Sequence, residues 1–227
     1  MAGSRISSLP LDILVDVIAR VAANSFCDLF NAQLCCKEFD RAGEDKYTLQ
    51  HVSIDKLPVI HRWLGREEVN SFFNRCMDSG NPEALFRQGM VEYFNTMRVE
   101  VGLEFLRRAA EQGHAEATYV YGMILLSTGG PSSLLGLQIL NTLTSSESIN
   151  KKIQDCRERI RTILRAMWIK NRSICQPPRL CHNHATPTTK VTETWGGRRI
   201  EDDGSCEACK WDSEFNLFCN MLIGVGA

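Results

Sequence analysis

The chain has 227 residues and is 44% hydrophobic, which is enough for one or two packed domains. Its 26 basic and 27 acidic residues nearly balance, so the overall charge does not indicate a nucleic-acid or membrane partner. No signal peptide is expected, because Asp12, Asp16 and Arg20 interrupt the first apolar run, and the apolar run 119–126 is too short to cross a bilayer. We therefore expect a soluble protein of the nucleus, the cytoplasm or both, with reduced thiols and no membrane partner.

The first predicted element is a helix over residues 9–21 with apolar side chains on nearly every side. These side chains are Leu9, Leu11, Ile13, Leu14, Val15, Val17, Ile18 and Val21. Pro10 suits a first helical turn, and Asp12 is favourable near a helix N-terminus. A surface helix normally keeps one apolar stripe of about 100° or a little more. The additional apolar side chains are therefore expected to be buried either in the groove of a partner protein or in the core of a larger helical domain.

Two more short helices are expected before residue 45, followed by a less regular connector. The motif Ser25-x-x-Asp28 is a variant capping box that begins the second helix, and the third helix carries Phe39. In the connector, residues 46–79, the segment 52–57 resembles a short strand or turn. Two further segments of the connector look helical, 59–64 and 69–77.

Residues 9–39 resemble the F-box. Its pattern is Leu-Pro-x-acidic-aliphatic-aliphatic, an aliphatic pair further on, Asp-Leu, and then Val-Cys-Lys-x-Trp. The matching residues are Leu9, Pro10, Asp12, Ile13, Leu14, Val17, Ile18, Asp28, Leu29, Cys36, Lys37 and Phe39. Cys35 stands where Val is usual and Phe39 where Trp is common, and both keep the apolar character. The resemblance implies three helices that dock on a Skp-type adaptor, which joins a cullin–RING ubiquitin ligase. The contacts that it implies are Leu9, Pro10, Ile13, Leu14, Leu29, Cys36 and Lys37.

Residues 80–150 contain an internal repeat with a period of about 34 residues. GNPEALFRQG at 80–89 aligns with GHAEATYVYG at 113–122, and GLEFL at 102–106 aligns with GLQIL at 136–140. Such a period indicates stacked helix–turn–helix units. Three aligned pairs are small residues: Ala84 and Ala117, Gly89 and Gly122, Gly80 and Gly113. We expect the first two pairs to let helices approach closely, and the third to end the preceding helices in the left-handed conformation.

Within this region, Ala109–Ala117 reads Ala-Ala-Glu-Gln-Gly-His-Ala-Glu-Ala, a signature of Sel-type repeats, which are relatives of tetratricopeptide repeats. The resemblance implies a short α-solenoid that offers a concave surface to proteins. Two repeats are visible, whereas solenoids normally need three or more, so we expect the segments on either side to cap the stack. The alternative is that the stack only spaces the tail.

Residues 151–172 are predicted to form a basic amphipathic helix that caps the repeats, with eight Lys or Arg residues and two acidic ones. A cationic face can bind phosphates, so a zinc-containing regulator of nucleic acid is an alternative function. A solvated face, or one that attracts an acidic protein, explains the same charges. Nucleic acid is therefore the weaker hypothesis.

The tail, residues 173–227, holds five of the ten cysteines, and its prolines and threonines predict irregular chain. Cys206-x-x-Cys209 has the spacing of a zinc knuckle. The best second pair is Cys181 with His184, and Cys175 with Cys181 is almost as good. We therefore predict one zinc ion held by Cys181, His184, Cys206 and Cys209, which would stabilise a segment with little apolar content. Buried thiols beside aromatic rings, or a redox pair, are the alternatives.

Together these patterns predict a mainly α protein. Its parts are an F-box (1–45), a helical connector (46–79), Sel-type repeats (80–150), a basic capping helix (151–172) and a small Cys/His-rich tail (173–227). The arrangement resembles a group of plant F-box proteins. Some of these end in a MYND-type zinc finger, but this tail lacks the dense cysteine pairs of that finger, so we assign no MYND ligands.

No nucleophile elbow, phosphate loop, dinucleotide fingerprint or HExxH motif is present in the sequence. We therefore expect a non-catalytic subunit that joins a Skp-type adaptor, and through it a cullin–RING ligase, to an unidentified target protein. The other F-box hypothesis is an adaptor that works outside ubiquitination.

Overall fold

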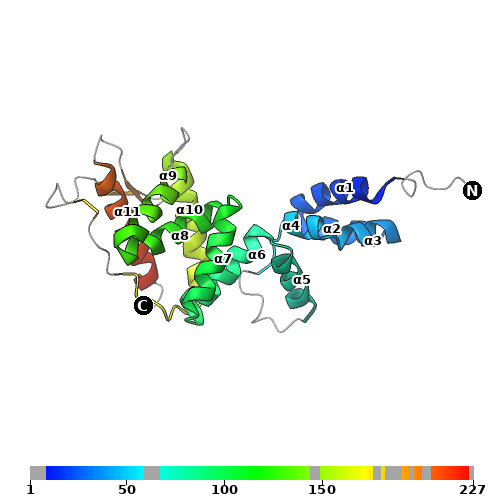
Figure 1. The fold of residues 1–227 in the computed structure, drawn as a ribbon, viewed down its shortest axis with the longest axis horizontal. Helices are drawn as coiled ribbons and strands as arrows, with labels where there is room; N and C mark the ends of the chain where they lie inside the picture. Colours follow the sequence, from blue (N-terminus) through cyan, green and yellow to red (C-terminus); the bar gives the residue numbers. More distant parts are fainter. Residues whose placement is uncertain are drawn as a thin grey trace, which may run out of the picture. The chain divides into compact units, whose positions relative to one another are not determined.

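The computed structural model describes residues 9–58, 67–143, 149–175, 180–181, 191–194, 197–200 and 206–224. Within these residues the chain is mainly helical, which confirms the predicted fold class (Figure 1). The chain divides into two compact units, Met1–Gln88 and Gly89–Ala227. Among the described helices, none combines the length and the apolarity that crossing a bilayer requires.

The first unit begins with the three predicted helices, α1 (Leu11–Asn24), α2 (Phe26–Gln33) and α3 (Lys37–Gly43). Ser25 separates the first two. Its hydroxyl accepts a hydrogen bond of 3.1 Å from the backbone N–H of Cys27. Because the first N–H groups of a helix have no partner within the helix, this N-cap defines where α2 begins. The predicted start of the second helix at Ser25 is therefore confirmed.

Three more helices follow in this unit: α4 (Lys46–His51), α5 (Glu67–Asp78) and α6 (Pro82–Met90). The segment 52–57 forms a turn and no strand, and the predicted helical segment 59–64 lies outside the described residues. Asn81 ties the end of α4 to the start of α6. Its side-chain nitrogen donates to the carbonyls of Leu49 (3.1 Å) and Val52 (2.9 Å), while its Oδ1 accepts from the N–H of Ala84 at 3.2 Å.

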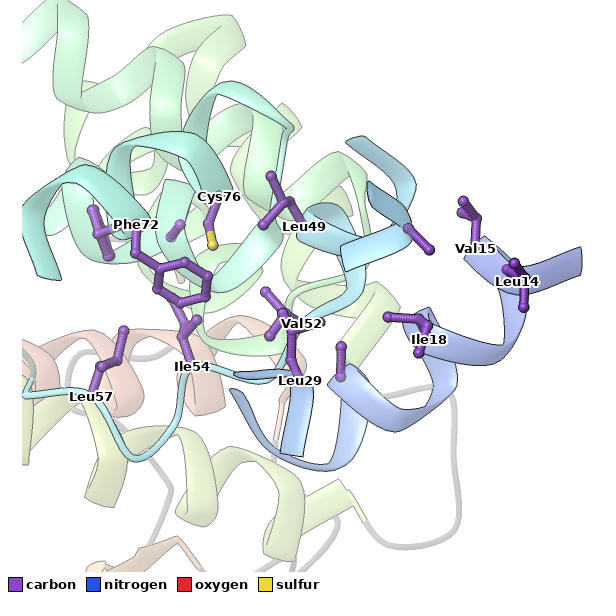
Figure 2. Close-up of a cluster of buried hydrophobic side chains, with 14 residues drawn as sticks. Leu14, Val15, Ile18, Leu29, Leu49, Val52, Ile54, Leu57, Phe72 and Cys76 are labelled. Carbon is purple, nitrogen blue, oxygen red and sulfur yellow. The ribbon is translucent and has the colours of Figure 1, made fainter. Parts of the chain in front are cut away.

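One apolar core holds the first unit together (Figure 2). Its side chains come from α1 to α6 and the segment 52–57, and include Leu14, Ile18, Leu29, Ala42, Leu49, Ile54, Phe72, Cys76 and Ala84. These residues are apolar positions of amphipathic helices, so their burial against one another explains why the short helices are stable. The described part of the predicted connector thus shares a core with the three helices of the predicted F-box.

Most of the predicted repeat region lies in the second unit, although its first helix, α6, begins in the first unit. A π-helix, η3 (Val91–Asn95), continues from α6, and it is followed by α7 (Val99–Glu111), α8 (Ala115–Thr128) and α9 (Gly130–Leu143). Gly113 ends α7 with a positive φ of 81°, and the aligned Gly80 follows α5 with a φ of 85°. Both glycines therefore adopt the predicted left-handed conformation.

Small residues let the helices of each repeat approach closely, as predicted. Gly89 faces Gly102 and Leu106 in the first repeat, and Gly122 faces Gly136 and Leu140 in the second. A Cβ atom on Gly122 would lie 2.5 Å from Cγ of Leu140, and one on Gly136 would lie 2.8 Å from the carbonyl oxygen of Gly122. Real Cβ atoms essentially never come this close, so the two repeats share the same glycine-dependent packing.

Helix α10 (Ile149–Arg165) follows the repeats. It ends at Arg165, whereas the sequence predicted a helix that continues to residue 172. The chain leaves the helical path because Lys170 and Asn171 both donate their backbone N–H groups to the carbonyl of Phe94, at 2.8 and 3.0 Å. The side chain of Asn171 also donates to the carbonyl of Tyr93 at 3.2 Å. These bonds fix the chain after α10 against η3.

The tail is more regular than its composition predicts. Strand β1 (Val191–Thr194) pairs with the antiparallel strand β2 (Gly197–Ile200), with Val191 opposite Ile200. The last described element is α11 (Glu207–Gly224), a helix that the sequence interpretation did not assign. Its buried side chains include Trp211, Phe215, Phe218 and Leu222. These apolar residues give the tail a packed helix of its own.

Candidate functional site

The first candidate site is the exposed face of α1. The helix buries one side against the core through Leu14, Val15, Ile18 and Ala22. On the other side, Ile13 and Val17 lie one turn apart and are 47% and 45% exposed. Leu9 and Leu11 at the N-terminal end are also exposed, each at 43%. Some of the apolar side chains of this helix are thus buried in the core of the unit, and the others are exposed to solvent.

The structure separates the seven predicted adaptor contacts into three groups. Leu9, Pro10, Ile13 and Lys37 are exposed, and Cys36 is half-buried. Leu14 and Leu29 are only 3% and 0% exposed, because they belong to the apolar core of the unit. These two leucines support the exposed residues from beneath. As contacts to a partner, all seven stay predictions.

Two exposed apolar residues near the end of α2 were not among the predicted contacts. Leu34, which follows the helix, is 86% exposed, and Phe30 is partly exposed with its ring centroid 5.0 Å from that of Phe72. The signal that could have identified Leu34 is its position just before Cys35-Cys36-Lys37, where a polar residue would be expected at a solvent-facing helix end. We call Leu9, Leu11, Ile13, Val17, Phe30 and Leu34 the exposed apolar set.

The second candidate site is a cluster of three cysteines in the tail. The Sγ atoms of Cys181, Cys206 and Cys209 all lie within 4.8 Å of one another, and those of Cys181 and Cys206 are 3.9 Å apart. Cys181 and Cys209 are buried and Cys206 is half-buried. The structure therefore brings together three of the four predicted metal ligands, and this cysteine cluster could hold a metal ion. His184, the fourth predicted ligand, lies outside the described residues.

Local structure fixes each member of the cysteine cluster. Cys206 immediately precedes α11 and accepts the backbone N–H of Lys210 at 3.1 Å, so the two-residue spacer to Cys209 follows the first turn of the helix. The carboxylate of Asp212, one turn further on, accepts the backbone N–H groups of Leu180 (2.9 Å) and Cys181 (3.0 Å). Asp212 thereby holds Leu180 and Cys181 beside the start of α11.

The remaining tail cysteines lie elsewhere in the unit. Cys219 is buried, its Sγ is 3.8 Å from the carbonyl oxygen of Ile174, and burial raises the pKa of its thiol to about 12. Cys175 hydrogen bonds to Cys219 and contributes to the same rise in pKa. Neither residue belongs to the cysteine cluster. The geometry therefore does not support the alternative prediction, in which Cys175 and Cys181 form the second pair of metal ligands.

A buried polar centre joins α11 to the repeats. Tyr119 on α8 donates its hydroxyl to Oε1 of Glu214 at 2.6 Å, and Nε of Arg157 on α10 lies 3.3 Å from the same oxygen. Burial raises the pKa of Glu214, while Arg157 and the Tyr119 hydroxyl act in the opposite direction. Trp211 adds a second polar link by donating its indole N–H to Asn141 of α9 at 3.0 Å.

The basic helix α10 directs part of its charge toward acidic groups of the chain itself. Arg157 pairs with Glu214, as described above. Arg159 lies 3.2 Å from Glu116, and Arg161 lies 2.8 Å from Glu158. These three cations are therefore partly neutralised within the unit, which weakens the argument for a phosphate-binding face.

Comparison with known proteins identifies the family of the chain. A family model described as plant tetratrico peptide repeats matches residues 55–165. The F-box protein At1g67623 of Arabidopsis thaliana is 33% identical over 174 residues, which cover 75% of this chain and 57% of that protein. The F-box protein At2g35280 of the same plant is 31% identical over 126 residues, which cover 56% of this chain and 76% of that protein. The chain belongs to the F-box protein family.

Further F-box relatives extend over more sequence than this chain matches. At1g67340 of Arabidopsis thaliana is 27% identical over 130 residues, and the matched part is 34% of its length. The chain thus spans a little over half of At1g67623 and about a third of At1g67340. No solved structure matches the chain. The predicted recognition, a plant F-box protein with tetratricopeptide-like repeats, is confirmed by these matches.

Proposed function

We propose that this F-box protein is the substrate-recruiting subunit of a cullin–RING ubiquitin ligase and that its first helices bind a Skp-type adaptor. The observation that carries the proposal is the exposed apolar face of α1, where Ile13 and Val17 remain nearly half exposed although the opposite side of the helix is fully packed. Apolar side chains in this number and pattern are typical of a helix that completes its burial in a partner.

The second unit would then hold the target protein. Its tetratricopeptide-like helices offer a surface separate from the exposed apolar set, and Trp168 and Leu134 are prominently exposed there. Such repeat stacks present extended surfaces to proteins. Because a bound target and the ligase machinery would share one complex, a target lysine would experience a high effective concentration of the charged conjugating enzyme. This mechanism requires no catalytic residue in the chain.

A binding measurement with a matched control tests the adaptor interaction. The full-length chain is co-expressed with a Skp-type adaptor, and the complex is measured by size-exclusion chromatography and calorimetry. Burying one such aliphatic side chain contributes about 1.5–3 kcal/mol, so Ile13→Asp with Val17→Asp should weaken binding roughly 100-fold or more. Changing Leu9 and Pro10 to Ala should also abolish a stable complex.

Leu134→Asp serves as the control because it changes another exposed aliphatic side chain, on α9 of the second unit. It should leave adaptor binding unchanged. Helical content by circular dichroism should be the same in all variants, since the altered side chains lie outside the core. Wild-type affinity of the Ile13/Val17 double variant would contradict the proposed interface.

A single zinc ion in the tail is compatible with this function as a structural cofactor. Its site is the cysteine cluster, which lies in the other unit. Loss of such an ion would therefore leave the exposed apolar set unaltered.

A further inference from the structure

We infer that Cys181, Cys206 and Cys209 bind a structural zinc ion that fastens the start of α11 to the chain that follows α10. The distances between the three sulfur atoms fit such an ion. Four ligands around zinc at about 2.3 Å place neighbouring thiolate sulfurs about 3.8 Å apart. The Sγ atoms of Cys181 and Cys206 are 3.9 Å apart, and the third sulfur lies within 4.8 Å of both.

The same distances argue against a disulfide as the purpose of the cluster. An S–S bond is about 2.05 Å long and joins two sulfurs, so it would leave the third cysteine unused. A shared ion explains why Cys181 converges on the Cys206-x-x-Cys209 pair, although Cys181 and Cys206 are 25 residues apart in sequence. Thiolate ligands select soft metal ions, and zinc suits a closed structural site because it has no redox chemistry of its own.

The backbone around the cluster is arranged as a metal site requires. Cys206 and Cys209 lie at the beginning of α11, where backbone N–H groups and the helix dipole favour the negative charge of thiolates. The carboxylate of Asp212 fixes Leu180 and Cys181 through their N–H groups, so the third sulfur is held in place by a residue of α11 itself. Such supporting contacts orient the ligands of metal sites.

The bound ion would hold Cys181 beside the N-terminal end of α11. The rest of that helix is already packed through Trp211, Phe215 and Phe218, and Glu214 joins it to Tyr119 and Arg157. Each coordinating thiol releases its proton to solvent when zinc binds, so zinc affinity should fall at acidic pH. The role is structural, because removing the ion would release the first turn of α11 from Cys181.

Elemental analysis of the full-length protein, purified under reducing conditions with zinc present, tests the inference. We expect close to one equivalent of zinc per chain, a value that fits the high affinity of structural sites. Cobalt reconstitution should give the strong near-ultraviolet absorption of thiolate-to-metal charge transfer. Less than about a tenth of an equivalent of zinc, without that absorption, would overturn the inference.

Matched serine variants locate the site. Cys181→Ser, Cys206→Ser and Cys209→Ser should each lose most of the bound zinc and weaken the cobalt absorption, whereas Cys175→Ser should retain both. Cys175 is the control because it is a half-buried cysteine of the same tail outside the cluster. Wild-type zinc content in all three cluster variants would contradict the assignment.

Hydrogen exchange on the wild-type protein provides a readout that does not depend on a variant folding. Chelation should accelerate exchange in the first turns of α11 and leave α1 to α3 unchanged. Adaptor binding should survive chelation, so failure of the zinc inference and failure of the proposed function give different results. Equal exchange of α11 with and without chelator would show that the ion does not fasten the helix.

Discussion

Burial gives individual cysteines of this protein different chemistry. Cys76 and Cys156 are packed inside their units, and burial raises the pKa of each thiol from 9.0 to about 12. Cys27 and Cys35 are exposed on or beside α2. Since the thiolate is the reactive form, a pKa of about 12 leaves roughly one buried thiol in ten thousand ionised at pH 8.

Thiol labelling should therefore be selective. Iodoacetamide at pH 8 is expected to modify Cys27 and Cys35 in the native protein, and to reach Cys76 and Cys156 only after denaturant is added. Peptide mass spectrometry at successive times measures this order. Modification of native Cys156 as fast as Cys35 would show that its environment is more open than the structure has it.

Glu214 should give the second unit a characteristic pH dependence. Burial raises its pKa in the folded state above the unfolded value, so folding favours the protonated carboxyl. The stabilisation from this shift is fully present below the unfolded pKa and is lost as pH rises through the folded pKa. Glu214→Gln removes the titrating group while keeping a similar shape.

The free energy of unfolding of the wild type, relative to Glu214→Gln, should accordingly decline as pH rises from about 4.5 through the folded pKa. Urea denaturation at several pH values measures this difference. Glu158→Gln, which alters an exposed glutamate of α10, is the control and should show no such decline. A difference that increases with pH would mean that Arg157 dominates over burial.

Single residues also show how far sequence reasoning reaches. The cap at Ser25 and the left-handed glycines 80 and 113 were predicted, because local backbone chemistry decides them. His114 of the repeat signature caps α8, because its Nδ1 accepts the backbone N–H of Ala117 at 3.2 Å. The pairing of Tyr119 with Glu214 was not predictable, since it joins residues far apart in the chain.

At the scale of elements, the packing of α8 against α9 depends on glycine. A Cβ atom at position 136 would meet backbone atoms of Gly122 and Leu126 at 2.8 and 2.9 Å. Gly136→Ala gains about 1 kcal/mol of helix propensity. Overpacking costs about 1–3 kcal/mol and must here move backbone, so the variant should be less stable than the wild type.

Urea unfolding monitored by circular dichroism measures this loss. Gln138→Ala is the matched control, because it alters an exposed residue of the same helix and should change stability by less than about 0.5 kcal/mol. A Gly136→Ala variant as stable as the wild type would show that α8 and α9 can separate at no cost.

Elements differ in how well the sequence predicted them. Helices with a strong local signal, such as α1 and α2, were expected close to their observed positions. Helix α10 ends at Arg165 because the carbonyl of Phe94, distant in sequence, binds Lys170 and Asn171. Helix α11 was missed because its mixed pattern has no clear apolar stripe and follows a stretch rich in proline and threonine. Tertiary packing decides both cases.

For the whole molecule, the two candidate sites fall in separate units, with the exposed apolar set in the first and the cysteine cluster in the second. The sequence predicted all three cysteines of the cluster. Cys206 and Cys209 were predicted from their two-residue spacer, and Cys181 from the short spacer that separates it from His184. It did not distinguish buried from exposed residues within the F-box pattern, because Leu14 and Ile13 are neighbours in sequence and only packing separates them.

The exposed aliphatic side chains of α1 affect the solubility of the chain in a cell. If the proposed adaptor covers this face, a molecule synthesised in excess of that adaptor leaves these side chains in water, where they favour self-association. Supply of the adaptor would then limit how much chain persists in a dispersed form, and orphaned copies would aggregate or be degraded. Recombinant yield of well-dispersed material should accordingly rise when the adaptor is produced in the same cells.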